Sequence, residues 1–168
     1  MKASGGRLGW LLFLSLLVSP MAGAGDLPEI TLRVDGTPLP AEVAATADSR
    51  TTGLSGRDRL GPNRGMLFVW NRSARRRFWM KGTRIPLSIA FLDKRGRIIN
   101  IHRMPPPPSG RPQDGYRRYP SHGPARFALE VNRGWFSAHG IEAGSRCHFR
   151  LPAGIAGSEV VVGNPKQP

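Results

Sequence analysis

The feature that most limits the fold of this chain is the shortness of its regular segments, which turn signals interrupt every few residues. "PEITLRV" alternates apolar and polar residues, Asp35-Gly36 follows, and "PLPAEVA" resumes the alternation. An Asp-Gly pair between two alternating runs is a strong signal for a two-residue hairpin turn. The sequence therefore predicts a β-hairpin whose first strand has Ile30, Leu32 and Val34 on one face.

Later segments have similar lengths and add further strands. "GMLFVW" is a continuous apolar run, and "IPLSIAFLD", which begins near Pro86, is apolar almost throughout. The second run is typical of a strand that is covered on both faces. A "KRG" turn joins it to "RIINIHRM", and "FWMK" is expected to begin another strand. "ARFALEV" alternates, with Phe127, Leu129 and Val131 on one face.

Two stretches carry helix signals instead. Thr46 suits the N-cap of a short helix near 47–54, with Asp48 in the first turn and Gly53 as the stop. In "NRGWFSAHG" we expect one or two helical turns, capped by Asn132 and ended by Gly140. About eight short strands and two short helices predict a mainly β fold (β-rich α+β), in the form of a small barrel- or sandwich-like domain.

The first 24 residues have the three parts of a secretory signal peptide. Lys2 and Arg7 give a positive start, residues 8–18 are largely apolar, and Ala22 and Ala24 provide the small residues before the cut. The alternative is a membrane anchor, but the apolar run is about half of the roughly 20 residues that a spanning helix needs. We therefore predict residues 1–24 to be a signal peptide and the protein to be exported, to the periplasm or the cell exterior.

Removal of this segment would leave a single β-rich domain at 25–151 and a C-terminal tail at 152–168, with no transmembrane segment. In the tail, "SEVVVG" could add an edge strand. Cys147 is the single cysteine, so no internal disulfide can form. Because it alternates with Phe149 on one strand face, we interpret it as a buried, inert thiol rather than a catalytic one.

The net charge of the chain is +14, with 25 Lys and Arg residues against 11 Asp and Glu. Such a balance favours contact with polyanions. An exported protein rarely meets nucleic acid, so we expect an anionic or glycan ligand of the cell envelope rather than nucleic acid as the partner. The alternative is that the arginines are solvated surface residues.

Residues 105–124 contain seven prolines and no apolar period, and the segment is long for a loop of a compact domain. It includes "GYRRY", in which Tyr116 and Tyr119 enclose Arg117 and Arg118. Interleaved aromatic and arginine side chains can stack on bases or sugars, although in loops they are also ordinary solubilising residues. We select these four residues as candidate ligand-binding residues.

The strongest candidate site lies in "FWMKG". On a strand, Phe78 and Met80 would face one side while Trp79 and Lys81 face the other. Trp79 offers an aromatic wall and Lys81 a charge, which together suit an anionic or sugar-like ligand. Gly82 permits the close approach of a backbone or a ligand. The alternative is that Trp79 belongs to the core and Lys81 to its rim.

Glu130 is the best carboxylate for a partner role, since it lies opposite in phase to the apolar face of its strand. Its alternative is a solvated strand glutamate. The four histidines stand apart from one another and from other metal-type ligands. No Gly-x-Ser-x-Gly, phosphate-loop or His-Glu-x-x-His pattern occurs. We therefore assign no catalytic residue, no metal and no cofactor.

Several separated motifs resemble the domain-of-unknown-function 192 family, an uncharacterised conserved family. They are "EVAATADSRTTGLSGRDRL", "GMLFVW", "FWMKGTRIPLSIAFLD", "YPSHGPARFALEVNRGW" and "HGIEAGSRCHF", between about residues 42 and 149. The chain departs from the family pattern at Gly82, usually asparagine, at Ser88, usually aspartate, and at Ser55, usually methionine. The resemblance implies a compact β-rich domain, often exported, with no established activity. Because Ser88 carries no charge, a mechanism that needs a Lys-Asp pair with Lys81 is in doubt.

Three hypotheses follow. The first is an exported, non-enzymatic binding module whose site involves Trp79, Lys81, Gly82 and the "GYRRY" loop, with Glu130 as a partner. The second is an enzyme-like envelope factor that uses Lys81 and Glu130. The third is a structural envelope protein whose charge binds anionic surfaces.

Overall fold

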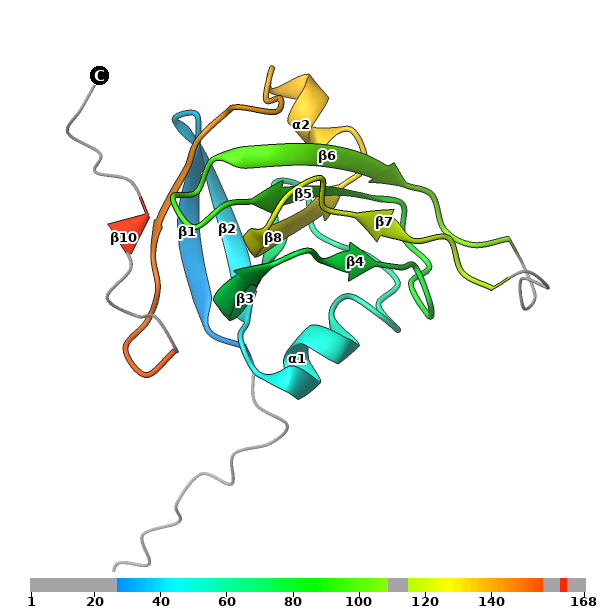
Figure 1. Ribbon diagram of the computed structural model, residues 1–168. Helices are drawn as coiled ribbons and strands as arrows, with labels where there is room; N and C mark the ends of the chain where they lie inside the picture. Colours follow the sequence, from blue (N-terminus) through cyan, green and yellow to red (C-terminus); the bar gives the residue numbers. More distant parts are fainter. Residues whose placement is uncertain (1–26, 109–114, 156–160, 163–168) are drawn as a thin grey trace, which may run out of the picture.

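The computed structural model describes residues 27–108, 115–155 and 161–162. The predicted signal peptide and most of the predicted tail lie outside these residues. Figure 1 shows one strongly curled sheet with a two-stranded ribbon and a helix in front of it. The elements are β1 (Glu29–Val34), β2 (Thr37–Ala44), α1 (Ala47–Thr52), β3 (Gly65–Ala74), β4 (Arg77–Phe78), β5 (Leu87–Leu92), β6 (Ile98–Met104), β7 (Tyr119–Pro120), β8 (Ala125–Asn132), α2 (Trp135–Ala138), β9 (Cys147–Arg150) and β10 (Val161–Val162).

The strand order in the main sheet is β10-β9-β1-β2-β3-β8-β5-β6, and β4 pairs with β7 in the ribbon. The predicted hairpin is confirmed as β1–β2, which turns at Asp35 and Gly36. Both turn residues have positive φ, 43° and 85°, as a type I′ turn requires. The expected edge strand of the tail is β10, which pairs with β9.

The sheet curls until its two ends meet. Arg97, just before β6, forms an isolated bridge with Arg146, just before β9. Next to it, the Ile98 amide donates to the Ser145 carbonyl oxygen at 2.9 Å, and the Cys147 amide donates to that of Gly96 at 2.8 Å. These bonds join opposite edges of the sheet at one end, so the fold is a small, partly closed barrel, as the sequence predicted.

Curling divides the apolar residues into two clusters, one on each face of the sheet. The inner cluster fills the barrel and includes Phe127, Leu129 and Val131 of β8. The outer cluster includes Phe68, Phe91 and Ala128 and is packed beneath α1 and the β4–β7 ribbon. All six residues of β5 are buried, which confirms a strand that is covered on both faces.

The two helices match the sequence to different degrees. Helix α1 is confirmed, since the Thr46 hydroxyl oxygen accepts from the Ser49 amide at 3.1 Å and the helix ends at Gly53. The predicted cap of α2 is wrong, because this helix begins after Gly134. The Asn132 side chain instead donates to the carbonyl oxygens of Leu60 and Gly61, so it ties β8 to the loop before β3.

Candidate functional site

The centre of the candidate site is a turn rather than a strand. The expected strand from "FWMK" is wrong in its extent, since β4 ends at Phe78. The chain then turns at Met80–Thr83, where the Thr83 amide donates to the Met80 carbonyl oxygen at 3.2 Å. The expected alternation of faces is nevertheless present, because Met80 is buried while Trp79 and Lys81 are exposed.

Trp79 is 43% exposed, and among the residues that the structure describes it is the large hydrophobic side chain that is exposed to solvent. The interpretation of Trp79 as a core residue is therefore wrong. Its ring lies under the Arg118 guanidinium, at 3.8 Å from the guanidinium carbon to the ring centroid. This contact brings the "GYRRY" segment against the "FWMKG" turn, a proximity that the sequence could not show.

Gly82 has a structural reason to be glycine. Its φ is +70°, and a Cβ at this position would lie 2.3 Å from the Ser55 hydroxyl oxygen. The Gly56 amide also donates to the Gly82 carbonyl oxygen at 2.9 Å. Gly82 therefore allows the close approach of another backbone segment, and this contact fixes the turn against the loop that follows α1.

A narrow crevice of about 50 Å³ opens between this turn and the C-terminal part of α1. It has an aromatic wall, a rim of hydroxyl groups and two cationic side chains. Its lining residues are Arg50, Thr51, Thr52, Gly53, Leu54, Ser55, Phe68, Phe78, Trp79, Lys81, Thr83 and Glu130. The sequence identified three of them, Trp79, Lys81 and Glu130, as site residues. It missed the hydroxyl rim, because Thr51 to Ser55 give only helix-end signals.

Glu130 lies on the outer face of the sheet, in register with Met66 of β3 and Ile89 of β5. It is 5% exposed, so the interpretation as a solvated strand glutamate is wrong. Within the described residues its carboxyl group has no hydrogen bond or ion pair with another side chain. Burial raises the pKa of Glu130 to about 8, so the group is mostly a neutral carboxylic acid at pH 7.

The four residues of the "GYRRY" segment have different positions. Tyr119 is 3% exposed and belongs to the outer cluster, so it is a core residue of β7. Arg117 is exposed and lies 5.2 Å from the Tyr119 ring centroid. Tyr116 is half-buried and lines a hollow of about 220 Å³ with Met80 and the run Pro105–Pro108. Arg118 alone of the four reaches Trp79.

A second, open hollow of about 620 Å³ connects these features. It shares Ser55 and Thr83 with the crevice and shares Tyr116 with the hollow beside the prolines. The three depressions therefore adjoin one another at these residues, and together we call them the groove. Trp79 and the 115–118 segment stand at its edges.

Two other groups of residues lie away from the groove. Ser88 faces the opposite side of β5, where its hydroxyl oxygen accepts from the Gly134 amide at 3.1 Å. A carboxylate at position 88 would therefore not reach Lys81.

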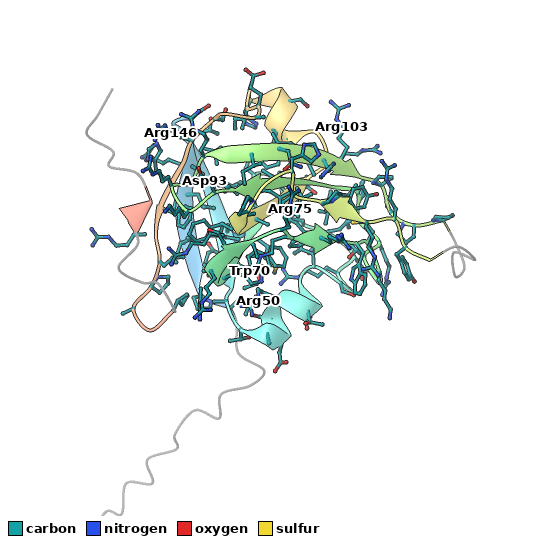
Figure 2. The ribbon with its side chains drawn as sticks, in the orientation of Figure 1. Arg50, Trp70, Arg75, Asp93, Arg103 and Arg146 are labelled. Atoms are coloured by element: carbon teal, nitrogen blue, oxygen red, sulfur yellow. The ribbon has the colours of Figure 1, made fainter. Side chains whose placement is uncertain are left out.

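Of the three consecutive arginines, Arg76 lies 4.4 Å from the Trp70 ring centroid, and Arg50 contacts the same ring at 5.7 Å. Figure 2 shows Arg50, from α1, next to Trp70, from β3.

Groups of three or more His, Cys, Asp or Glu side chains that could hold a metal ion are absent from the described residues. Neither α1 nor α2 is long and apolar enough to cross a membrane.

The family model for DUF192, described as "Uncharacterized ACR, COG1430", matches residues 30–149. The chain belongs to the DUF192 family. The match confirms the resemblance seen in the sequence and extends it to the first strand, so it includes every element from β1 to β9 at least in part. No curated protein matches this DUF192 chain.

Two solved structures are similar to this DUF192 protein. One is a protein of unknown function from Novosphingobium aromaticivorans DSM 12444, with 30% identity and a TM-score of 0.64, and the alignment covers 85% of this chain and 99% of that one. The other, from Sinorhizobium meliloti 1021, is described as a "putative transcription regulator". It has 27% identity and a TM-score of 0.67, with coverage of 76% and 98%. Both support the small β fold.

Proposed function

We propose that this DUF192 protein is an exported, non-enzymatic binding module for an anionic or sugar-like ligand of the cell envelope. The observation that carries the proposal is the placement of Trp79 and Lys81, both exposed, at the mouth of a crevice whose floor holds the unpaired carboxyl group of Glu130. An aromatic wall beside a few convergent polar groups is the usual composition of a small-ligand site.

The charge around the groove favours an anion. Lys81, Arg84 and Arg118 are exposed beside it, and Arg84 is paired only with the equally exposed Asp58. The Asp58 carboxylate offsets the charge of Arg84, so Lys81 and Arg118 carry the net positive charge beside the groove. An anionic ligand would therefore gain from the groove as a whole, whereas a cation would be repelled.

The contact between Trp79 and Arg118 supports a ligand with an aromatic-stacking face, such as a sugar ring. The indole ring is exposed on a turn that the Gly82–Ser55 contact fixes, while Arg118 comes from a separate segment. A sugar could replace the guanidinium on the ring, and Arg118 would then pair with an anionic substituent.

The test is binding to a panel of anionic and neutral envelope glycans by the wild-type protein and by Lys81→Ala and Trp79→Ala. Both variants are expected to lose binding while the melting temperature changes by no more than about 2 °C, because both side chains are exposed. Lys94→Ala is a matched control, since Lys94 also lies in an exposed turn, between Asp93 and Gly96. Equal binding by all three variants would refute the proposal, as would a melting temperature that falls with Lys81→Ala by many degrees.

A second candidate function is an enzyme-like envelope factor that uses Lys81 and Glu130. It is favoured by one observation, that both residues line the same crevice and the pKa of Glu130 is raised to about 8. A carboxyl group with a pKa near the working pH suits general acid–base chemistry. This candidate requires turnover in a hydrolase or transferase screen that both Lys81→Ala and Glu130→Gln abolish.

A purely electrostatic envelope protein is the third candidate, supported by the net charge of +14. Its affinity for heparin, anionic vesicles or duplex DNA would fall steeply with salt and would not depend on Lys81 or Trp79 in particular. Binding that persists at high salt excludes it. The same assay tests nucleic acid, which an exported protein is not expected to meet.

A further inference from the structure

We propose, on the basis of the binding module described above, that the crevice receives a carboxylate group of the ligand, with the Glu130 carboxylic acid donating a hydrogen bond to it and Lys81 supplying the opposite charge. The ligand class is thus a carboxylate-bearing molecule, such as a uronic acid or a peptide C-terminus.

The size of the crevice limits what can enter. Its volume of about 50 Å³ is smaller than those of the two neighbouring hollows, about 220 Å³ and about 620 Å³. A small group such as a carboxylate therefore suits the crevice better than a whole sugar ring does. Only the end of a ligand enters the crevice, and the rest of it would lie in the open hollow that shares Ser55 and Thr83.

The lining of the crevice is rich in donors. The Glu130 side chain is only 5% exposed and has no partner among the described side chains. Phe68 and Phe78 line the same crevice. The Glu130 carboxyl oxygens are not among the fully buried atoms that lack a partner, so they are open to the crevice, where a ligand oxygen can pair with them. Ser55, Thr83 and Lys81 also line the crevice, and their side chains can donate to an oxygen.

The protonation state of Glu130 determines whether the ligand group that pairs with it must accept or donate a hydrogen bond. Burial raises its pKa to about 8, so at neutral pH the group offers an O–H and needs an acceptor. The other charged groups that line the crevice are Arg50 from α1 and Lys81 from the turn, and both are cationic. The strands β3 and β8 contribute no other charged side chain to it. A cationic ligand group is therefore disfavoured, and an anionic acceptor is favoured.

Acetate and acetamide provide the test, because they have the same shape and differ in charge. Each is titrated into the full chain at constant ionic strength while NMR follows the Trp79 indole N–H, the amides of residues 51–55 and the Glu130 side-chain carboxyl carbon. We expect acetate to shift these signals with at least about tenfold higher affinity than acetamide, a difference of about 1.4 kcal/mol. For the wild-type protein, acetate binding should weaken as the pH rises through about 8, because Glu130 then loses its proton.

The Glu130→Gln variant keeps a donor that does not titrate. It should therefore still bind acetate, without the loss of affinity at alkaline pH. Lys81→Ala should weaken acetate binding by at least about tenfold and leave acetamide unchanged. Lys94→Ala should change neither. The melting temperature of each variant is compared with that of the wild type, so that a loss of binding can be distinguished from a loss of the fold.

The outcomes separate this inference from the proposed function. Equal affinity for acetate and acetamide, or no shift with acetate at all, overturns the carboxylate inference, while glycan binding that depends on Trp79 would leave the binding module standing. A Glu130 pKa near its ordinary value of 4.5 in the free protein would mean that Lys81 folds inward as its ion-pair partner, and that result also overturns the inference. If neither a glycan nor acetate binds in a way that depends on Trp79, both the carboxylate inference and the proposed function are overturned.

Discussion

The two faces of the curled sheet differ in what covers them. The inner face is closed by the sheet itself and by α2, and its buried side chains are apolar apart from the Cys147 thiol and the Ser88 hydroxyl, which is paired with the Gly134 amide. The outer face is covered by short pieces, namely α1, the β4–β7 ribbon and the Met80–Thr83 turn. Only beneath this second cover does the crevice with its buried carboxyl group occur.

Strand β8 shows the difference at adjacent residues. Leu129 points into the barrel, in register with Leu67 and Ala90, while Glu130 points out beneath α1. On the inner face, burial raises the pKa of the Cys147 thiol, so the thiol is not a nucleophile there. On the inner face the Ser88 hydroxyl is already paired with the Gly134 amide, whereas beneath the short separate segments of the outer cover the Glu130 carboxyl group lies at a crevice in which it can meet a ligand.

The largest effect is expected on the inner face. Phe127→Ala removes a fully buried ring that contacts Phe149 edge-on, with 5.1 Å between ring centroids. We expect the free energy of unfolding to fall by about 3–5 kcal/mol, measured by urea denaturation, with ligand affinity of the folded fraction unchanged. A loss below about 1 kcal/mol would show that the barrel interior is not the dominant core.

The next effect concerns Glu130 and pH. Between pH 4.5 and about 8 the folded protein keeps a proton on Glu130 that the unfolded chain has released. The free energy of unfolding of the wild type should therefore decrease as the pH rises through this window, by a few kcal/mol in total, since each unit of pKa shift corresponds to about 1.4 kcal/mol.

The Glu130→Gln variant is the control for this pH dependence, since its amide does not titrate. Denaturant curves recorded at several pH values should show a smaller slope for the variant than for the wild type. Equal slopes for the two proteins would contradict the assignment of Glu130 as a buried, unpaired acid. The two faces of the sheet would then not differ in this respect.

A smaller effect is expected at the contact between two segments of the outer cover, the Met80–Thr83 turn and the loop that follows α1. Gly82→Ala introduces a Cβ at φ +70° and 2.3 Å from the Ser55 hydroxyl oxygen. We expect a loss of about 1–3 kcal/mol of unfolding free energy from the strained backbone and the contact. Adding Ser55→Ala should recover only part of it, because the backbone strain remains. Full recovery would show that φ at position 82 is unimportant.

The smallest effect is expected at the rim of the groove. Arg84→Gln breaks the pair with Asp58, whose side chains are 68% and 81% exposed. The unfolding free energy should change by less than about 0.5 kcal/mol, because water and salt screen such a pair. The same variant is informative for binding, since it removes a cation from the open hollow without disturbing the crevice. A large change in stability would place Arg84 in the structural cover rather than at its surface.

Much of the fold could be predicted from local patterns. The hairpin at Asp35-Gly36, the helix after Thr46 and the twice-covered strand at 87–92 depend on neighbouring residues, and the structure contains all three. The cap of α2 failed because Asn132 bonds to Leu60 and Gly61, more than seventy residues away in sequence. A side chain with a distant partner of that kind gives no local signal.

The candidate site was predictable only in part. Alternation correctly separated Met80 from Trp79 and Lys81, yet it could not show that Trp79 is exposed or that Tyr119 is buried. It also could not show that Ser55 and Gly82, two positions that depart from the usual family residues, lie against each other. Contacts between segments that are far apart in sequence produced each of these results.

By itself, the sequence determined the strand-rich class, the family, the basic charge and the pairs of residues that share a face of each strand. The tertiary structure alone decided which faces are sealed and which are open. Periodicity records only the direction in which a side chain leaves its own strand. Whether Glu130 meets water, apolar side chains or a crevice beside Lys81 depends on how α1 and the Met80–Thr83 turn pack over the sheet, and that arrangement is a property of the whole fold.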